Sequence, residues 1–326
     1  MTPHRTRTSR LTVIERLFGV VVALVLAQPL PAAAWNAAGH RLVASLAWDV
    51  LEEPARREAA QLLRAHPDYR RWIRRVEGGD EERTAFIEAS TWADEIRKDR
   101  RFYTPGKEPA TPLLPGFPDM ERHRDWHYVN RPLAAPRPGE AITGVLDRQL
   151  VTLAQAVGTP DAAPSARAYA LVWLIHLVGD AHQPLHASAR RRPPGPHEKG
   201  EEREDEQDMM VINPFNARQS TTTIHAFWDD LPGPPWLRGE RLAAASRALT
   251  AAYLQGLPAR STPAQWLAES WEIAGSSAYP PLSDGRTISP AFYDEARTIA
   301  ERRLALAGYR LGELLNAALR VKRRGD

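Results

Sequence analysis

Histidine and aspartate residues recur in this chain at spacings that suit a metal site. His176 and Asp180 are separated by three residues, and so are His225 and Asp229. Because residues four apart lie on one face of a helix, both side chains of each pair can reach one cation. Further candidates accompany these pairs: Asp94, His127, His186 and His40, the last of which follows Trp35 by five residues. The spacing therefore predicts a metal site.

The stretch from His176 to His186 carries the strongest part of this signal. It holds three histidines and one aspartate within eleven residues, at the end of an apolar helix expected to begin near Ala166. A single histidine there would more often be a hydrogen-bonded core residue, but ionisable groups in such number are costly to bury unless they are paired or metal-bound. His182 is left out of the predicted site, because Pro184 breaks helical continuity between it and His186.

The remaining candidates each have an ordinary alternative. His225 and Asp229 could form a helix salt bridge, and Asp94 with Arg97 could be a surface ion pair. His127 lies between two aromatic residues, Trp126 and Tyr128, where it could serve packing alone. Together they supply a coordination set. The ligands must be nitrogen and oxygen, because the chain has no cysteine and therefore neither thiolates nor disulfides.

Helices must position these residues. Apolar residues recur at helical spacing over 42–51, 55–63, 141–157, 166–178, 241–254, 262–274 and 290–318. This pattern predicts an all-α fold, a single multi-helix domain, and its 43% hydrophobic content suffices for a full core. Only 209–213 and 220–224 have strand-like composition, so we expect at most one small β-hairpin.

The first 34 residues have the composition of a secretory signal peptide. Four arginines precede an apolar run from Leu17 to Ala27, and a small-residue exit ends at Ala34. We expect cleavage at that point and export to the periplasm or the medium. No membrane span is expected, because no later segment reaches the ~20 apolar residues that a membrane helix needs.

The functional domain is expected over 35–318. It contains a charged, proline-rich insert at 190–208, expected to be a surface loop, and a basic tail follows at 319–326. Without residues 1–34 the chain has 39 basic and 39 acidic residues, because that segment holds four arginines and one glutamate. The balance argues against a strongly basic nucleic-acid binder, whatever the precursor's pI of about 9.3.

Five motifs in order resemble the S1/P1 nuclease family: Trp35-x4-His40, Trp92-Ala-Asp94-x2-Arg97, Trp126-His127-Tyr128, His176-x3-Asp180-x5-His186 and His225-x3-Asp229. The resemblance implies an all-α fold shared with bacterial zinc phospholipases C. It also implies a zinc-dependent enzyme acting on single-stranded nucleic acid and on nucleotides. No obligate protein partner is evident from the sequence.

The resemblance further implies three zinc ions. One would be bound by Asp94, His127, His176 and Asp180, and a second by His186, His225 and Asp229. The third would be bound by His40, Asp180 and the α-amino and carbonyl groups of Trp35. Asp180 would bridge two ions, and the Trp35 amine would exist only after Ala34 is removed.

Metal chemistry suggests the reaction. Zinc lowers the pKa of a bound water toward ~7, which gives a nucleophile for attack on phosphorus. Arg97 is the expected clamp for the phosphate oxygens, and Asp94 and Asp180 are the other expected catalytic residues. Family products would be 5′-phosphorylated fragments with 3′-hydroxyl ends. Tyr128 is the expected stacking wall for a base.

The substrate side of the site departs from the family pattern. Asn130 stands where many members carry an aspartate that reads a base edge, the Gly-Gly-Asn turn before the hairpin is missing, and Thr223 replaces the usual asparagine. Two alternatives to a nuclease therefore stay open: a phospholipase C type phosphodiesterase, and a zinc-binding protein with little turnover. Arg97, which has no role as a ligand, favours an enzyme.

Overall fold

The structure is a computed structural model that describes residues 35–74, 79–134, 142–190, 209–253, 255, 261–281 and 286–320. The predicted signal peptide, the insert beyond Arg190 and the tail beyond Arg320 lie outside the described residues. Eleven α-helices are numbered from α2 in the described part: α2 (Ala37–Val50), α3 (Glu53–Arg64), α4 (Tyr69–Ile73), α5 (Glu81–Ala89), α6 (Trp92–Glu95), α7 (Leu146–Val157), α8 (Pro164–Asp180), α9 (Ile224–Asp230), α10 (Gly239–Tyr253), α11 (Pro263–Ser277) and α12 (Pro290–Ala318). The expected all-α class is confirmed.

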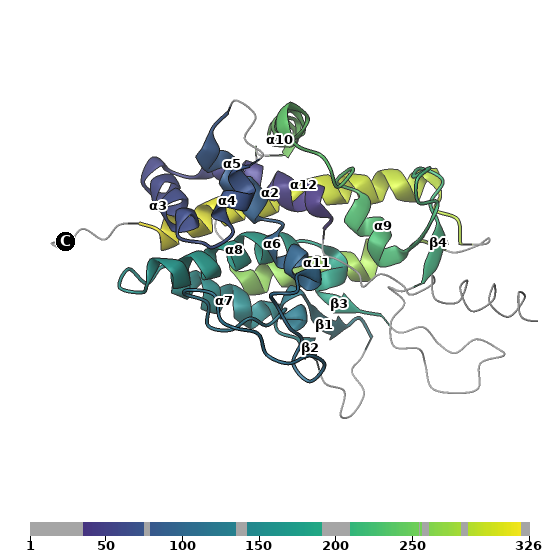
Figure 1. The fold of residues 1–326 in the computed structure, drawn as a ribbon. Helices are drawn as coiled ribbons and strands as arrows, with labels where there is room; N and C mark the ends of the chain where they lie inside the picture. Colours follow the sequence, from purple (N-terminus) through teal and green to yellow (C-terminus); the bar gives the residue numbers. More distant parts are fainter. Residues whose placement is uncertain are drawn as a thin grey trace, which may run out of the picture. The chain divides into compact units, whose positions relative to one another are not determined.

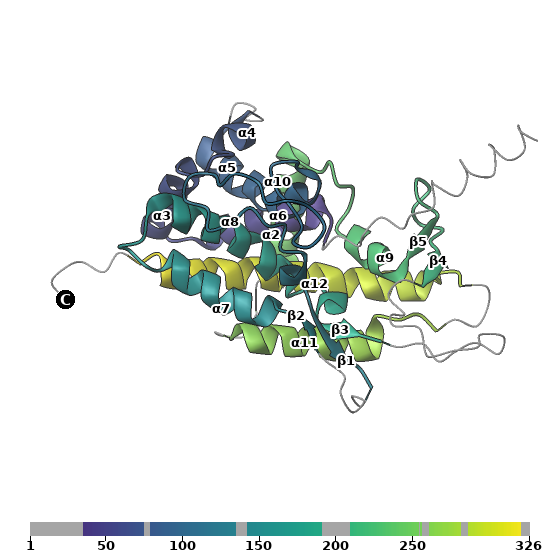
Figure 2. The same ribbon diagram turned by 60° about the horizontal axis from the view of Figure 1, so that its bottom comes forward.

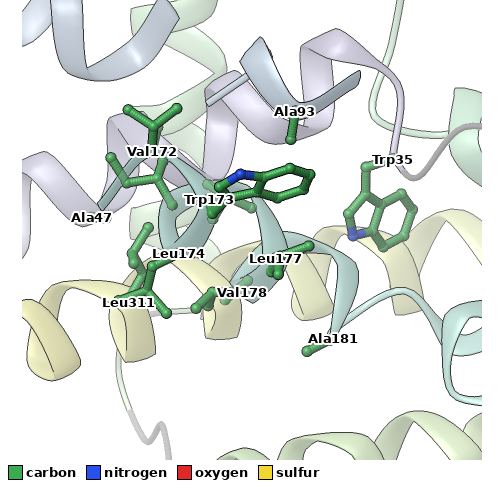
Figure 3. Packing of buried hydrophobic residues seen from close by; sticks show 14 of the residues in the cluster. Trp35, Ala47, Ala93, Val172, Trp173, Leu174, Leu177, Val178, Ala181 and Leu311 are labelled. Carbon is green, nitrogen blue, oxygen red and sulfur yellow. The ribbon is translucent and has the colours of Figure 1, made fainter. Parts of the chain in front are cut away.

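Helix α8 forms the centre of the core. Proline occupies its first turn, and every residue from Arg167 to Asp180 is buried. An apolar helix without a polar face requires neighbours on all sides, and α7, α3, α12 and α2 supply them. Figure 3 shows Trp173, Leu174 and Leu177 of α8 among the buried side chains of this core. The core therefore fixes the helix end that carries His176 and Asp180.

Helices α2 and α12 lie side by side in both views (Figures 1 and 2) and pack closely. Two glycines one turn apart on α12 permit this approach. A Cβ atom at Gly308 would lie 2.4 Å from the Cβ of Leu46, and one at Gly312 would lie 2.6 Å from the Cβ of Val50. The packing fixes α2, whose first turn carries His40.

Two small sheets complete the described fold. The predicted hairpin is present as β4 (Met210–Ile212) paired antiparallel with β5 (Thr221–Thr223). A second sheet, in the order β2-β1-β3, corrects the expectation of at most one hairpin. Its strands are β1 (Val129–Pro132), β2 (Thr143–Gly144) and β3 (Ser188–Ala189). Such short strands carry no alternating pattern, and the parallel β1–β3 pair depends on segments far apart in the sequence.

The same sheet corrects one helix boundary. The sequence pattern predicts a helix from Ala141, but α7 begins at Leu146, because Thr143 and Gly144 pair with β1. Three short 3₁₀ turns were also not expected: η1 (Ile96–Lys98), η2 (Arg124–His127) and η3 (Pro184–His186). Within the described residues, no helix has both the length and the apolar character needed to cross a membrane.

Candidate metal centre

Six elements bring the predicted histidines and aspartates together. The residues and their elements are His40 from α2, Asp94 from α6, His127 from η2, His176 and Asp180 from α8, His186 from η3, and His225 and Asp229 from α9. All are buried except Asp94, which is partly buried. Their nitrogen and oxygen atoms form three groups in which every atom lies within 4.8 Å of the others: His40–Asp94–His176, His127–His176–Asp180 and His186–His225–Asp229.

Two of these groups share His176 and together form the first cluster, which centres on Asp180, and the third group is the second cluster. Asp180 Oδ2 lies 3.0 Å from His127 Nδ1 and 3.3 Å from His176 Nε2. His176 Nε2 lies 3.8 Å from Asp94 Oδ1. The other ring nitrogen of His176 donates to the carbonyl of Ser90 at 2.8 Å, which leaves the Nε2 lone pair facing the two carboxylates. A lone pair opposite carboxylate oxygens is repulsive unless a proton or a cation lies between them.

The pKa shifts in this cluster show the same demand for positive charge. Burial alone would lower the pKa of His176, but Asp180 and Asp94 outweigh it and raise the pKa above the usual value. Burial would raise the pKa of Asp180, but His176 and His127 hold it well below its ordinary range. Arg97 and His176 likewise lower the pKa of the partly buried Asp94. Both carboxylates thus stay ionised and require positive charge beside them.

The second cluster holds His186, His225 and Asp229. His186 Nδ1 donates to the carbonyl of His127 at 2.6 Å, so its Nε2 bears a lone pair, and this atom lies 2.9 Å from His225 Nε2. Burial lowers the pKa of both rings and raises that of Asp229. Two neutral imidazole nitrogens and a buried carboxyl group that converge on one point fit a divalent cation that accepts nitrogen and oxygen ligands.

Gly179 allows the His40 ring to lie in the first cluster. Its Nε2 lies 3.4 Å from Asp180 Oδ1, and its ring stacks on that of His176 with centroids 3.8 Å apart. A Cβ atom at Gly179 would lie 2.9 Å from His40 Nδ1 and 3.9 Å from Trp35 Cδ1. Gly179 therefore creates the space in which the His40 ring lies against α8. Figure 3 shows the Trp35 indole among the buried side chains of the core.

Several buried polar atoms of these residues have no hydrogen-bond partner among the residues that the structure describes. They are both ring nitrogens of His40, Nε2 of His127 and Oδ1 of Asp180. Buried polar atoms are almost always paired, so a group of unpaired atoms at one place indicates a bound ion or water. The donor set is nitrogen and oxygen only, which zinc accepts. The residues present therefore fit a metal centre.

Arg97 faces both clusters. Its Nε lies 3.2 Å from Asp94 Oδ1, and its side chain is 12% exposed. Burial and the positive charge of Arg97 together lower the pKa of His127 to about 3, and the same charge lowers those of His186 and His225. A guanidinium at this position can bind an anion that approaches the metal groups from solvent.

Tyr128 and Asn130 lie at the start of the β2-β1-β3 sheet, next to His127. Both are partly exposed. A Cβ atom at Gly144, which has a φ of +82°, would lie 2.6 Å from Tyr128 Cδ2, so this glycine lets the ring lie against β2. Asn130 Nδ2 donates to Thr143 Oγ1 at 3.2 Å. Thr223 accepts a hydrogen bond from the Ala226 backbone and so caps the helix that carries His225.

A buried network that the sequence did not indicate supports the turn between Asp180 and His186. His182 Nδ1 donates to the Val178 carbonyl at 2.8 Å, and its Nε2 accepts from Arg310 at 3.0 Å. This arrangement agrees with its exclusion from the predicted site. Arg303 donates to the His182 carbonyl and to Ser270 Oγ, and Ser270 donates to the Ala181 carbonyl at 2.6 Å. Side chains thus satisfy the carbonyl of Val178, near the end of α8, and those of Ala181 and His182 just beyond it.

Two further positioning residues were not found from the sequence. Gln183 Nε2 donates to Asp229 Oδ1 at 2.8 Å and so joins η3 to α9. Glu269 accepts bonds from both Arg303 and Arg310, and its negative charge offsets part of their positive charge. Neither residue has a spacing relative to the histidines that would mark it, because each contact depends on the packed fold.

Comparisons with known proteins agree with this geometry. Residues 35–320 match the family described as S1/P1 Nuclease. The chain is also similar to a protein of Arabidopsis thaliana named Endonuclease 5, with 22% identity over 319 residues, which covers 88% of this chain and 91% of that protein. The matched range begins at Trp35 and includes every residue of the two clusters.

Proposed function

The chain belongs to the S1/P1 nuclease family, and on this premise we propose that it is an exported zinc phosphodiesterase. It cuts single-stranded DNA and RNA internally, leaves 5′-phosphorylated products, and removes phosphate from 3′-nucleotides. The observation that carries the proposal is the convergence of three nitrogen–oxygen donor groups beside one arginine that lies close to both clusters.

We assign three zinc ions to the centre. Asp94, His127, His176 and Asp180 hold one, and His186, His225 and Asp229 hold another. His40, Asp180 and the amine and carbonyl of Trp35 hold the third. When bound, zinc lowers the pKa of water and polarises phosphate oxygens. Cleavage before Trp35 creates one of the ligands, so removal of residues 1–34 is a condition of full activity.

The protein side chains orient the phosphodiester. Arg97 binds the equatorial phosphate oxygens, where charge grows during in-line attack, and Asp94 holds the guanidinium in place through its Nε. Tyr128 stacks on the base next to the cleaved bond, which requires an unpaired base and gives the preference for single strands. Asn130 contacts the base edge. Because an amide both donates and accepts hydrogen bonds, it tolerates a wider range of bases than an aspartate does.

The proposal is tested with purified protein that begins at Trp35. A labelled single-stranded oligonucleotide is incubated with it, with and without a zinc chelator, and the product ends are identified. We expect chelator-sensitive fragments with 5′-phosphate ends, and release of phosphate from 3′-AMP but not from 5′-AMP. Arg97→Met is the matched variant, because it should keep the bound zinc and lose turnover.

An intact oligonucleotide under zinc-replete conditions would contradict the proposal. Hydrolysis of phosphatidylcholine vesicles by the same sample would then favour the phospholipase C type alternative. Zinc binding without either activity would favour a zinc-binding protein.

A further inference from the structure

Trp236 is unusually exposed for a residue in a well-anchored loop. Its side chain is 53% exposed, and the guanidinium carbon of Arg218 lies 4.5 Å from the centre of its ring. Arg218 is itself exposed and comes from the turn of the β4–β5 hairpin. A large apolar side chain left in water costs free energy, and an arginine stacked on it adds a positive charge to the same surface.

Three side-chain hydrogen bonds anchor the loop that carries Trp236. The carbonyl of the preceding Pro235 accepts a hydrogen bond from Arg41 at 2.8 Å, and that of Gly233 accepts one from Asn36 at 2.8 Å. Arg238 donates to Glu88, which is 6% exposed. The indole is therefore held at a fixed place on the surface, and binding to it costs little ordering of the loop.

The turn that carries Arg218 is also well defined. Asn213, which is 5% exposed, donates its backbone N–H to Ser220 at 2.7 Å. Asn216 accepts the N–H of Arg218 through its side chain at 3.2 Å. Phe215, in the same turn, stacks on Tyr293 of α12 with ring centroids 4.4 Å apart. Two anchored segments thus meet through the Arg218–Trp236 pair.

Helix α9 connects this pair to the metal centre. The chain runs from β5 directly into α9, which contributes His225 and Asp229, and then into the loop that carries Trp236. Figure 1 shows α9 beside the hairpin. Residues 209–228 contain no aspartate or glutamate, so no acidic group of this segment repels a phosphate near Arg218. The pair combines an aromatic face and a cation, the two features that bind single strands.

We propose that Arg218 and Trp236 form a stacking platform for single-stranded nucleic acid outside the metal centre. A base of the same strand stacks on the exposed face of Trp236, and Arg218 binds a neighbouring phosphate. This inference rests on the proposed nuclease function and adds a second contact to it, so that long strands bind more tightly than short ones.

The test compares Trp236→Ala and Arg218→Ala with the wild-type chain that begins at Trp35. KM and kcat are measured on a long oligothymidylate and on a thymidine dinucleotide, which has no base beyond the two that flank the cleaved bond. We expect Trp236→Ala to raise KM for the long substrate about tenfold, with the dinucleotide unaffected. Trp236→Phe should restore most of the loss, because it keeps a stacking face.

Arg218→Ala should lower the slope of log KM against log salt concentration by about 0.7, the value for one phosphate contact on a single strand. The matched controls are Leu113→Ala, which removes a side chain 64% exposed, and Arg247→Ala, which removes an arginine 69% exposed. Neither control should change KM on either substrate.

Equal KM values for wild type and Trp236→Ala on the long substrate, or equal losses on both substrates, would overturn the platform and leave the nuclease function intact. If the wild type cleaves neither substrate, the nuclease function fails. The platform is then tested by fluorescence anisotropy of the labelled oligothymidylate under chelation. Weaker binding by Trp236→Ala than by the wild type supports the platform, and no binding by the wild type overturns it. Loss of binding to phosphatidylcholine–phosphatidylglycerol vesicles alone would instead assign the surface to a membrane.

Discussion

At the scale of single residues, the sequence predicts the metal-ligating residues better than it predicts the residues that create space for them or orient them. His176 and Asp180 were identifiable because four-residue spacing on a helix is a local property. Gly179, between them, was not, because its role depends on the His40 ring from another helix. The same holds for Gln183, whose contact with Asp229 joins segments 46 residues apart.

Gly179→Ala should displace the His40 ring, because the new Cβ would lie 2.9 Å from Nδ1. We expect zinc affinity to fall about ten- to hundredfold, measured by competition with a chelating dye. Gly275→Ala in α11 is the matched control, because a Cβ there meets only Leu133 Cδ2 at 3.7 Å. It should leave zinc affinity unchanged and stabilise the helix by about 0.8 kcal/mol. Unchanged affinity in Gly179→Ala would remove His40 from the metal centre.

Asp180→Asn keeps the shape of the side chain and removes its charge. If Asp180 bridges two ions, this variant should lose bound zinc and lower kcat by more than about a hundredfold, while circular dichroism shows the helices retained. The control is Asp230→Asn: Asp230 accepts a bond from Asn36 and belongs to none of the three donor groups. Normal turnover by Asp180→Asn would refute the bridging role.

At the scale of elements, helical periodicity predicted the long helices, and α8 with its uninterrupted apolar run most clearly. The short elements α6, η2 and η3 escaped prediction, although they carry Asp94, His127 and His186. An element of three or four residues has no period to detect, and tertiary contacts fix it instead. His123, for example, enters η2 with a φ of 39°, held by Asp119 at 2.8 Å and by stacking on Trp126.

The buried network behind α8 gives a prediction at this scale. Arg303→Leu would leave the His182 carbonyl without its donor and Glu269 with one cation fewer. We expect the free energy of unfolding to fall by about 1–3 kcal/mol, the usual cost of leaving a buried hydrogen-bonding group without its partner, measured by urea unfolding in the presence of a chelator. Arg302→Leu, at an exposed neighbouring position, should change it by less than about 0.5 kcal/mol. Equal effects of the two substitutions would contradict a supporting role for the network.

At the scale of the whole molecule, buried neutral histidines make the metal-free protein sensitive to acid. Burial lowers the pKa of His66 to about 3, and this residue lies outside the metal clusters. Its folded pKa is below the unfolded value, so its contribution to stability is present above pH 6.5 and is lost as the pH falls toward 3.

Chelated protein should therefore lose stability between pH 6.5 and pH 5, with His66 contributing on the order of 2 kcal/mol. His66→Asn should reduce this pH dependence, because an amide does not titrate in this range. The substitution should preserve the local structure, because the amide oxygen can still accept the Asp68 backbone N–H that His66 Nδ1 accepts now. Urea unfolding at several pH values measures the difference. The same slope in both proteins would show that His66 does not titrate on unfolding.

The central claim is that residues from six elements form one centre that binds three zinc ions once the chain begins at Trp35. The most direct test is the zinc content of that purified protein, with the ions located by anomalous diffraction at the zinc edge. We predict three ions, one of them bound by His40, Asp180 and the Trp35 amine. Protein that binds no zinc, or binds it away from Asp180, would contradict the account.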